Sequence, residues 1–128
     1  MKLTHIGLNV QSKEELVDFY QNILDFHLDY QFNLDSVLTN KIFGIREQIE
    51  IFLYTDENMK LELFVCPEPL KLGFSHICVE VTDRDMIVHK GKIAGYPVIR
   101  IERNNKPDML FIRDKSGNVF ELQNQQNV

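Results

Sequence analysis

The amino-acid sequence predicts an α+β fold in which two tandem βαβββ modules form an open, curved mixed sheet around a cleft. Two observations support this fold class: one order of strand and helix patterns occurs twice along the chain, and a segment with two prolines and a glycine separates the two occurrences. With 128 residues, the chain has the length of one compact domain. We therefore expect a single domain over 1–128, with module one at about 1–66, a linker at about 67–73 and module two at about 74–128.

Module one is predicted to begin with a strand over residues 4–10, because apolar residues alternate there with the period of a half-buried strand. One face of this strand would carry Ile6, Leu8 and Val10, and the other His5, Gly7 and Asn9. An amphipathic helix over about 13–24 follows, since Ser12 and Glu15 have the spacing of a capping box and apolar residues then recur at helical spacing.

The rest of module one is predicted to contain strands over 26–35, 48–55 and 59–65, of which the last two form a hairpin. The segment 36–45 is ambiguous and fits one helical turn or more, with poorly defined boundaries.

Module two repeats the same order of elements. We expect a strand over 75–81, a helix over about 84–94 that ends at Gly95, a strand over 96–102 and a hairpin through 114–118. In the hairpins, Phe111 is matched with Phe52, at the same offset along the chain that relates Glu121 to Glu62.

Histidine and glutamate residues recur at corresponding places in the two modules. His5 and His76 each stand between a hydroxyl residue and an isoleucine, and Glu62 and Glu121 each stand between two large apolar residues. The two histidines lie farther apart along the chain than the two glutamates, so module one is the longer of the two. The additional length is assigned to the ambiguous segment 36–45 of module one.

Composition and charge exclude several classes of protein. Nineteen acidic against fourteen basic residues give a net charge of −5, which would repel a phosphate backbone, so nucleic acid is not an expected partner. No apolar run approaches the ~20 residues that cross a bilayer, and the first residues lack the apolar core of a secretory signal. We expect a cytoplasmic protein without a membrane partner, in which Cys66 and Cys78 are reduced thiols.

The recurring histidines and glutamates predict a metal site. All four point away from the apolar face of their strand, so they converge in the cleft if the apolar faces pack on the helices. These residues are His5, Glu62, His76 and Glu121. Two carboxylates inside a cleft are costly unless a cation meets them. Two neutral imidazoles and two carboxylates balance one divalent ion, and such nitrogen and oxygen donors suit Zn, Ni, Co, Mn or Fe(II).

A four-ligand site leaves two positions of an octahedral shell free, so a small substrate with two oxygens can displace two waters. The alternative for each ligand is a solvated side chain on a polar strand face, but the occurrence of two matched pairs favours the metal. Asn9 and Phe64 share strand faces with these side chains and either line the cavity or are simply exposed.

Several motifs together resemble a known family. They are Thr4-His5-Ile6-Gly7-Leu8-Asn9-Val10, Phe19-Tyr20 with Ile23-Leu24-Asp25-Phe26, Gly73-Phe74-Ser75-His76-Ile77, and Phe111-Ile112-Arg113-Asp114 with Gly117-Asn118 and Phe120-Glu121-Leu122. Over nearly the whole chain the sequence resembles the vicinal oxygen chelate superfamily of glyoxalase I, methylmalonyl-CoA epimerase, extradiol dioxygenases and the fosfomycin- and bleomycin-resistance proteins. The resemblance implies paired βαβββ modules around a metal, with close pairing of modules within one chain or between the chains of a homodimer.

The ligand set resembles that of glyoxalase I-like enzymes, because dioxygenases and fosfomycin-resistance enzymes typically use two His and one Glu. The resemblance implies a lyase or isomerase of the lactoylglutathione lyase type, in which the metal holds an enediolate formed from a hemithioacetal. Glu121 or Glu62, the catalytic residues by this analogy, would leave the ion to move the proton.

A thiol co-substrate, glutathione or another thiol, is implied by the same resemblance, with Asn9 and Phe64 as the cofactor-binding residues. Glyoxalase I generally has an arginine at the position of Asn9 and often an asparagine at that of Cys66, so the sequence leaves the thiol open. The alternatives are a metal-free binding protein of the bleomycin-resistance type, served by Phe64, and another enzyme of the superfamily such as an epimerase or an extradiol dioxygenase.

Overall fold

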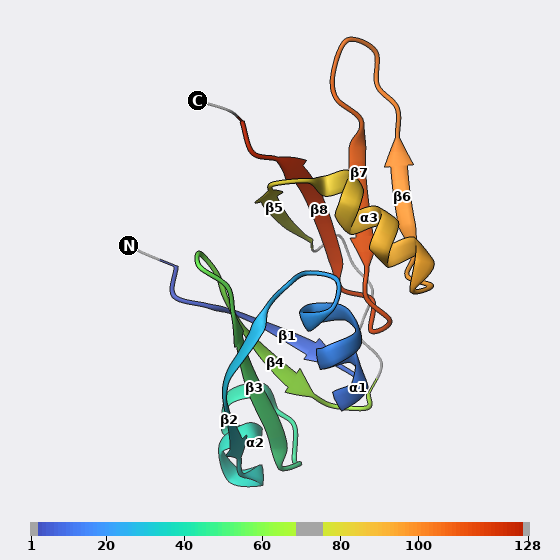
Figure 1. Cartoon of the computed structure of the whole chain (residues 1–128). Helices are drawn as coiled ribbons and strands as arrows, with labels where there is room; N and C mark the ends of the chain where they lie inside the picture. Colours follow the sequence, from blue (N-terminus) through green and yellow to red (C-terminus); the bar gives the residue numbers. More distant parts are fainter. Residues whose placement is uncertain (1–2, 69–75, 127–128) are drawn as a thin grey trace. The chain divides into compact units, whose positions relative to one another are not determined.

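A computed structural model describes residues 3–68 and 76–126, which fold into two compact units (Figure 1). The division between the units falls within 69–75, outside the described residues. Each unit holds a four-stranded mixed sheet in the order expected of a βαβββ module, which confirms the α+β class and the two tandem modules. Of the predicted linker, only residues 67 and 68 are described, and they lie outside helices and strands.

Unit one forms its sheet in the order β1-β4-β3-β2, with β1 parallel to β4 and the other neighbours antiparallel. Its elements are β1 (Ile6–Val10), α1 (Lys13–Glu15), the π-helix η1 (Leu16–Gln21), β2 (His27–Leu34), α2 (Ser36–Phe43), β3 (Ile49–Thr55) and β4 (Lys60–Val65). The ambiguous segment is therefore largely helical. Asp35 caps α2 by accepting a hydrogen bond from the Leu38 amide at 2.9 Å, and Gly44 ends it with a φ of 72°.

Unit two repeats this topology in the order β5-β8-β7-β6, with β5 parallel to β8. Its elements are β5 (Ile77–Val81), α3 (Arg84–Ile93), β6 (Val98–Ile101), β7 (Met109–Arg113) and β8 (Val119–Asn124). Asp83 caps α3 by accepting a hydrogen bond from the Met86 amide at 3.0 Å. Among the described residues, no helix combines the length and apolar character needed to span a membrane.

The first helix differs from its prediction. Ser12 occupies the N-cap position without a side-chain capping hydrogen bond, so the capping box predicted from Ser12 and Glu15 does not form. After α1 the helix widens to the π form, in which the Asn22 amide donates to the Val17 carbonyl oxygen at 3.0 Å, and it ends at Gln21. The apolar face predicted for this helix is nevertheless largely buried. The neighbouring rings of Phe19 and Tyr20 in η1 are fully buried and pack edge-on against each other.

Strand pairing gives the sheet of unit one two chemically different faces. Leu8 of β1 and Phe52 of β3 both lie opposite Leu63 of β4, so their side chains share one face with the fully buried Leu63. The first helix covers one face of this sheet (Figure 1), and we assign these side chains to that face. The main side chains of this helix-covered core are Val10, Leu16, Phe19, Tyr20, Leu61 and Leu63. By the alternation of side chains, Gly7 and Glu62 lie on the opposite face, as the sequence predicts.

The predicted match of Phe52 with Phe111 is wrong by one position. Leu53 lies opposite Glu62, and Phe111 lies opposite Glu121, so Leu53 and Phe111 are the structural equivalents. The cause is the turn between β7 and β8, which is longer by a single residue than the turn between β3 and β4. Because side chains alternate along a strand, this shift puts Phe52 on the helix-covered face and Phe111 on the opposite one.

Gly7 allows β1 to lie close to an aromatic side chain of β4. A Cβ atom at Gly7 would stand 3.1 Å from Cε2 of Phe64, whose ring packs edge-on against Phe43 of α2 with centroids 5.3 Å apart. The corresponding position in unit two holds Cys78, and Gln123 replaces the phenylalanine there. A side chain is thus accommodated only where the aromatic pair is absent.

Replacing Gly7 with alanine is expected to lower the free energy of unfolding by about 1–3 kcal/mol, because the added methyl group must displace Phe64 against Phe43. Urea denaturation followed by circular dichroism measures this loss. In a Phe64→Ala background the same substitution should cost less than half as much. Equal costs in the two backgrounds would contradict the proposed crowding.

Candidate metal centre

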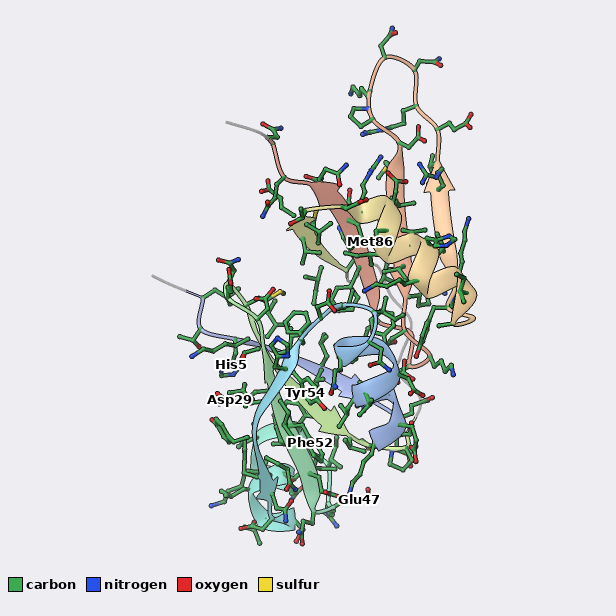
Figure 2. All side chains as sticks on the ribbon, viewed as in Figure 1. His5, Asp29, Glu47, Phe52, Tyr54 and Met86 are labelled. Carbon is green, nitrogen blue, oxygen red and sulfur yellow. The ribbon has the colours of Figure 1, made fainter. Side chains whose placement is uncertain are left out.

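Each unit places one histidine beside one glutamate with the same geometry. In unit one, Nε2 of His5 lies 3.4 Å from Oε2 of Glu62, at the beginning of β1 (Figure 2). In unit two, Nε2 of His76 lies 3.4 Å from Oε2 of Glu121. The pairing of residue types that the sequence predicts within each module is therefore present in both.

The register of the parallel strands produces both pairs. Gly7 lies opposite Glu62 in the β1–β4 pairing, and Cys78 lies opposite Glu121 in the β5–β8 pairing. Each histidine precedes that opposite residue by two positions, so it shares a face with the glutamate and reaches it diagonally. Two residues far apart in sequence are thus brought together by backbone hydrogen bonds.

The carboxylates of the two pairs are mostly shielded and the imidazoles are open to solvent. The side chains of Glu62 and Glu121 are 19% and 16% exposed, whereas those of His5 and His76 are 44% and 47% exposed. Shielding a carboxylate from water is unfavourable unless a hydrogen-bond donor or a cation binds it. The neighbours of Glu62 across the strands, Gly7 and Leu53, bring no side-chain charge.

The distance within each pair fits two donors of one divalent ion. With bonds of about 2.1 Å at angles between octahedral and tetrahedral values, two donors stand roughly 3.0–3.4 Å apart. Nδ1 of His5 lies 3.4 Å from Oγ1 of Thr4, so Nε2 is the nitrogen that faces Glu62. Nitrogen and carboxylate oxygen are also the donor types of the metals that the sequence favours.

Each unit by itself supplies only half of the predicted donor set. In neither described part, 3–68 or 76–126, do three or more His, Cys, Asp and Glu side chains gather to hold a metal. A site with four ligands therefore requires one pair from a first unit and one pair from a second unit. This four-ligand site stays a prediction.

Asn9 links two strands through side-chain hydrogen bonds. Its side-chain amide donates hydrogen bonds to the main-chain oxygens of Phe64 at 3.0 Å and Cys66 at 3.2 Å, which ties β1 to the end of β4. These bonds satisfy main-chain acceptors at the edge of the strand pair. The predicted contact of Asn9 with a thiol co-substrate is a separate matter and stays a prediction.

An aromatic surface that the sequence pattern did not indicate adjoins Glu62. Tyr30 lies opposite Leu53, and its ring stands 5.9 Å from that of Phe32, on the same face as Phe64. A bulge between Leu28 and Tyr30 changes the register of β2, so simple alternation along this segment misplaces Leu28. Phe64, a predicted cofactor-binding residue, belongs to this aromatic surface.

Cys78 distinguishes the second pair from the first. Burial raises the pKa of the Cys78 thiol, and Glu121 raises it further through its charge and by accepting a hydrogen bond from the thiol, with a smaller contribution from Glu80. The side chain is nevertheless exposed. Glu121 therefore has a neutral hydrogen-bond donor beside it in addition to His76, whereas the corresponding neighbour of Glu62 is a glycine.

The sequence matches a family model described as the Glyoxalase/Bleomycin resistance protein/Dioxygenase superfamily over residues 2–122. The structure is similar to the fosfomycin resistance protein FosX from Listeria monocytogenes, with a TM-score of 0.74 and 15% identity over 98% of this chain and 94% of that chain. It is also similar to a glyoxalase family protein from Bacillus cereus, with a TM-score of 0.74 and 16% identity over 99% of this chain and 95% of that chain. At such identities, the likeness to solved structures shows the fold alone. No curated protein matches the sequence.

Replacing Glu121 with glutamine is expected to speed alkylation of Cys78 several-fold in metal-free protein at pH 8. The substitution removes the charge that raises the pKa of the thiol, so the reactive thiolate fraction increases at a fixed pH. Iodoacetamide labelling with mass spectrometry of the Cys78 peptide measures the rate. Glu102→Gln, an exposed residue between β6 and β7, is the matched control, and an unchanged rate in the Glu121 variant would contradict the contact.

Proposed function

Because the chain belongs to the Glyoxalase/Bleomycin resistance protein/Dioxygenase superfamily, we propose that it is a metal-dependent lyase or isomerase of the glyoxalase I type, which moves a proton next to a carbonyl group of a small molecule. The observation that carries this proposal is the 3.4 Å contact between a histidine and a glutamate, repeated in both units. Duplication of the fold does not by itself preserve residue types, since Gly7 corresponds to Cys78 and Phe64 to Gln123. The repeated histidine–glutamate contact therefore supports a shared role.

The proposed ligands are His5, Glu62, His76 and Glu121, with Ni, Zn, Co, Mn or Fe as the ion. A mutant of FosX from Listeria monocytogenes, which shares this fold, is complexed with Mn(II) and 1S,2S-dihydroxypropylphosphonic acid, a compound with hydroxyl groups on two neighbouring carbons. When bound, a divalent ion withdraws charge from two adjacent substrate oxygens and makes the neighbouring carbon more acidic.

The chain itself supplies the proton transfer. An Oε atom of Glu121 or Glu62 accepts the proton from the carbon next to the carbonyl and returns it to the former carbonyl carbon, while the proton of the substrate hydroxyl moves to the former carbonyl oxygen. Shielding of both carboxylates from water favours this task, because fewer water molecules compete for the proton while it is held. The apolar side chains beside Glu62, namely Leu53 and Phe64, limit the access of water to it.

Both pairs must meet for the site to form. We propose that they do so within one chain or across a homodimer, with a thiol co-substrate in contact with Asn9 and Phe64. Mixing Glu62→Gln protein with Glu121→Gln protein distinguishes the two assemblies. Only a site shared between two chains regains activity in the mixture.

A second candidate function is a metal-free binding protein for an aromatic ligand. The specific observation in its favour is the aromatic surface beside Glu62, which includes Tyr30, Phe32 and Phe64. Flat aromatic ligands pack favourably on such rings. Metal content separates this candidate from the first.

The wild-type protein is expected to retain Ni, Co, Zn or Mn after incubation and dialysis, whereas Glu62→Gln and Glu121→Gln should bind at least about tenfold more weakly, since each loses a charged donor. Elemental analysis and calorimetry measure both quantities. Glu57→Gln and Glu102→Gln, both exposed, are the matched controls and should bind like the wild type. Retained stoichiometric binding in both ligand variants would place the site elsewhere.

The metal-loaded protein is expected to convert methylglyoxal and glutathione to lactoylglutathione, the most concrete version of the proposed activity. Glu121→Gln or Glu62→Gln should reduce kcat by about 10²–10⁴-fold, because the proton acceptor is lost. Formation of the thioester, followed by its ultraviolet absorbance, measures the rate. Metal-loaded wild-type protein without turnover would exclude this version and favour another thiol or an epimerase reaction.

A further inference from the structure

A cavity of about 430 Å³ lies in unit two beside the candidate metal ligand Glu121. Its wall is formed by the last residues of β8, the connection between β6 and β7, and the start of α3. The lining residues that bear on its chemistry are Arg84, Arg103, Asp108, Met109, Glu121 and Gln123. Its volume falls within the range of small-molecule binding sites.

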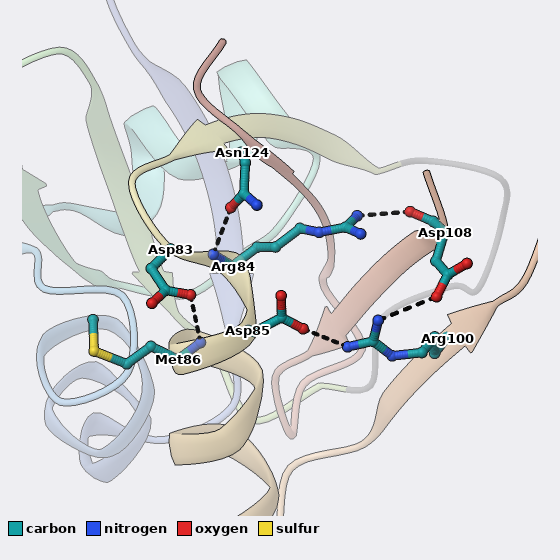
Figure 3. Close-up of polar contacts among 7 residues, drawn as sticks. All are labelled: Asp83, Arg84, Asp85, Met86, Arg100, Asp108 and Asn124. Atoms are coloured by element: carbon teal, nitrogen blue, oxygen red, sulfur yellow. Dashed lines mark hydrogen bonds and ion pairs between the residues drawn. The ribbon is translucent and has the colours of Figure 1, made fainter. Parts of the chain in front are cut away.

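Two arginines of this cavity are oriented by neutral acceptors. Nη1 of Arg84 donates to the main-chain oxygen of Asp108 at 2.6 Å (Figure 3). Nε and Nη2 of Arg103 donate to the main-chain oxygen of Pro107 at 2.9 Å and 2.7 Å. Among the described residues, no carboxylate forms an ion pair with either guanidinium, so both keep further N–H donors for a ligand.

Two carboxylates of this region, those of Asp85 and Asp108, form ion pairs with a third arginine. Arg100 pairs with Asp85 at 2.6 Å and with the carboxylate of Asp108 at 3.2 Å, so Asp108 offers only its main-chain oxygen to Arg84 (Figure 3). Under the proposed function, Glu121 is a metal ligand. The cavity therefore presents two guanidinium groups that form no ion pair with a side chain in the described part of unit two.

We propose that this cavity binds the oxyanion of the substrate or thiol co-substrate, a carboxylate, phosphonate or phosphate, and that Arg84 and Arg103 determine this specificity. Guanidinium groups bind such oxyanions through paired, charge-assisted hydrogen bonds. The reacting end of the molecule then lies toward Glu121. The identity of the ligand as substrate rests on the proposed function, whereas the binding of an oxyanion does not.

Glu121 couples the cavity to the metal centre. In metal-free protein its carboxylate repels an anion in the same cavity, and neutralising it relieves that repulsion. Glu121→Gln should therefore tighten the binding of an oxyanion to metal-free protein, although it weakens the binding of metal. These opposite effects of one substitution would not arise from a loss of folding.

The experiment titrates the metal-free full chain with inorganic phosphate and, separately, with malonate, using calorimetry at low ionic strength. Arg103→Gln should weaken binding by about tenfold or more, and Arg103→Lys by less, since lysine keeps the charge but not the paired donors. Lys106→Gln is the matched control, because it removes the same charge from the same connection at a residue outside the lining. It should change the affinity by less than about twofold, as expected of an exposed, screened charge.

Equal weakening by Lys106→Gln and Arg103→Gln, or no saturable binding of either anion to the wild type, would overturn the proposal. Tighter binding of phosphate than of malonate would indicate that the cavity binds a tetrahedral oxyanion. Tighter binding of malonate would indicate that it binds a carboxylate. Anion binding that depends on Arg103 in a protein that fails to bind metal would overturn the proposed function alone. Normal metal binding with an unchanged anion affinity in Arg103→Gln would overturn the cavity proposal alone.

Discussion

The parallel pairing of the first and last strands of each unit is the constraint on which the candidate centre depends. Its register fixes which residue of the first strand faces the glutamate, and the histidine two positions earlier then shares the face of that glutamate. A slip by one position would turn the imidazole to the helix-covered side. Because backbone hydrogen bonds set this register, the same 3.4 Å contact arises in two units whose surrounding side chains differ.

Those surroundings give the two pairs different chemical properties. Beside Glu62 lie a glycine and an aromatic surface, so this carboxylate has an apolar environment. Beside Glu121 lie the Cys78 thiol, whose pKa this carboxylate raises, and a cavity with two arginines. The two carboxylates therefore share the same contact with a histidine but differ in their neighbours, since a thiol lies opposite Glu121 where a glycine lies opposite Glu62.

Much of the fold followed from patterns within the sequence, because alternation in residues 4–10 and the helix between Asp83 and Gly95 are decided by local chemistry. The pairs of His5 with Glu62 and His76 with Glu121 were predictable because duplication repeats residue types. The equivalence of Leu53, and not Phe52, with Phe111 was not predictable, because one additional residue in a turn changes the register without changing the strand pattern. Arg84 and Arg103 of unit two were not predicted as binding residues, because main-chain oxygens orient them and any residue type carries such an oxygen.

Helix α2 has a consequence for the orientation of a ligand in the proposed centre. It places Phe43 against Phe64 on the face of Glu62, whereas the connection 102–108 of unit two contains no helix. A donor set related by a two-fold rotation would let a ligand bind in two equivalent orientations if its walls were also symmetric. When both halves form one centre, as proposed, a bulky aromatic wall on one half and none on the other removes that equivalence and favours one of the two orientations.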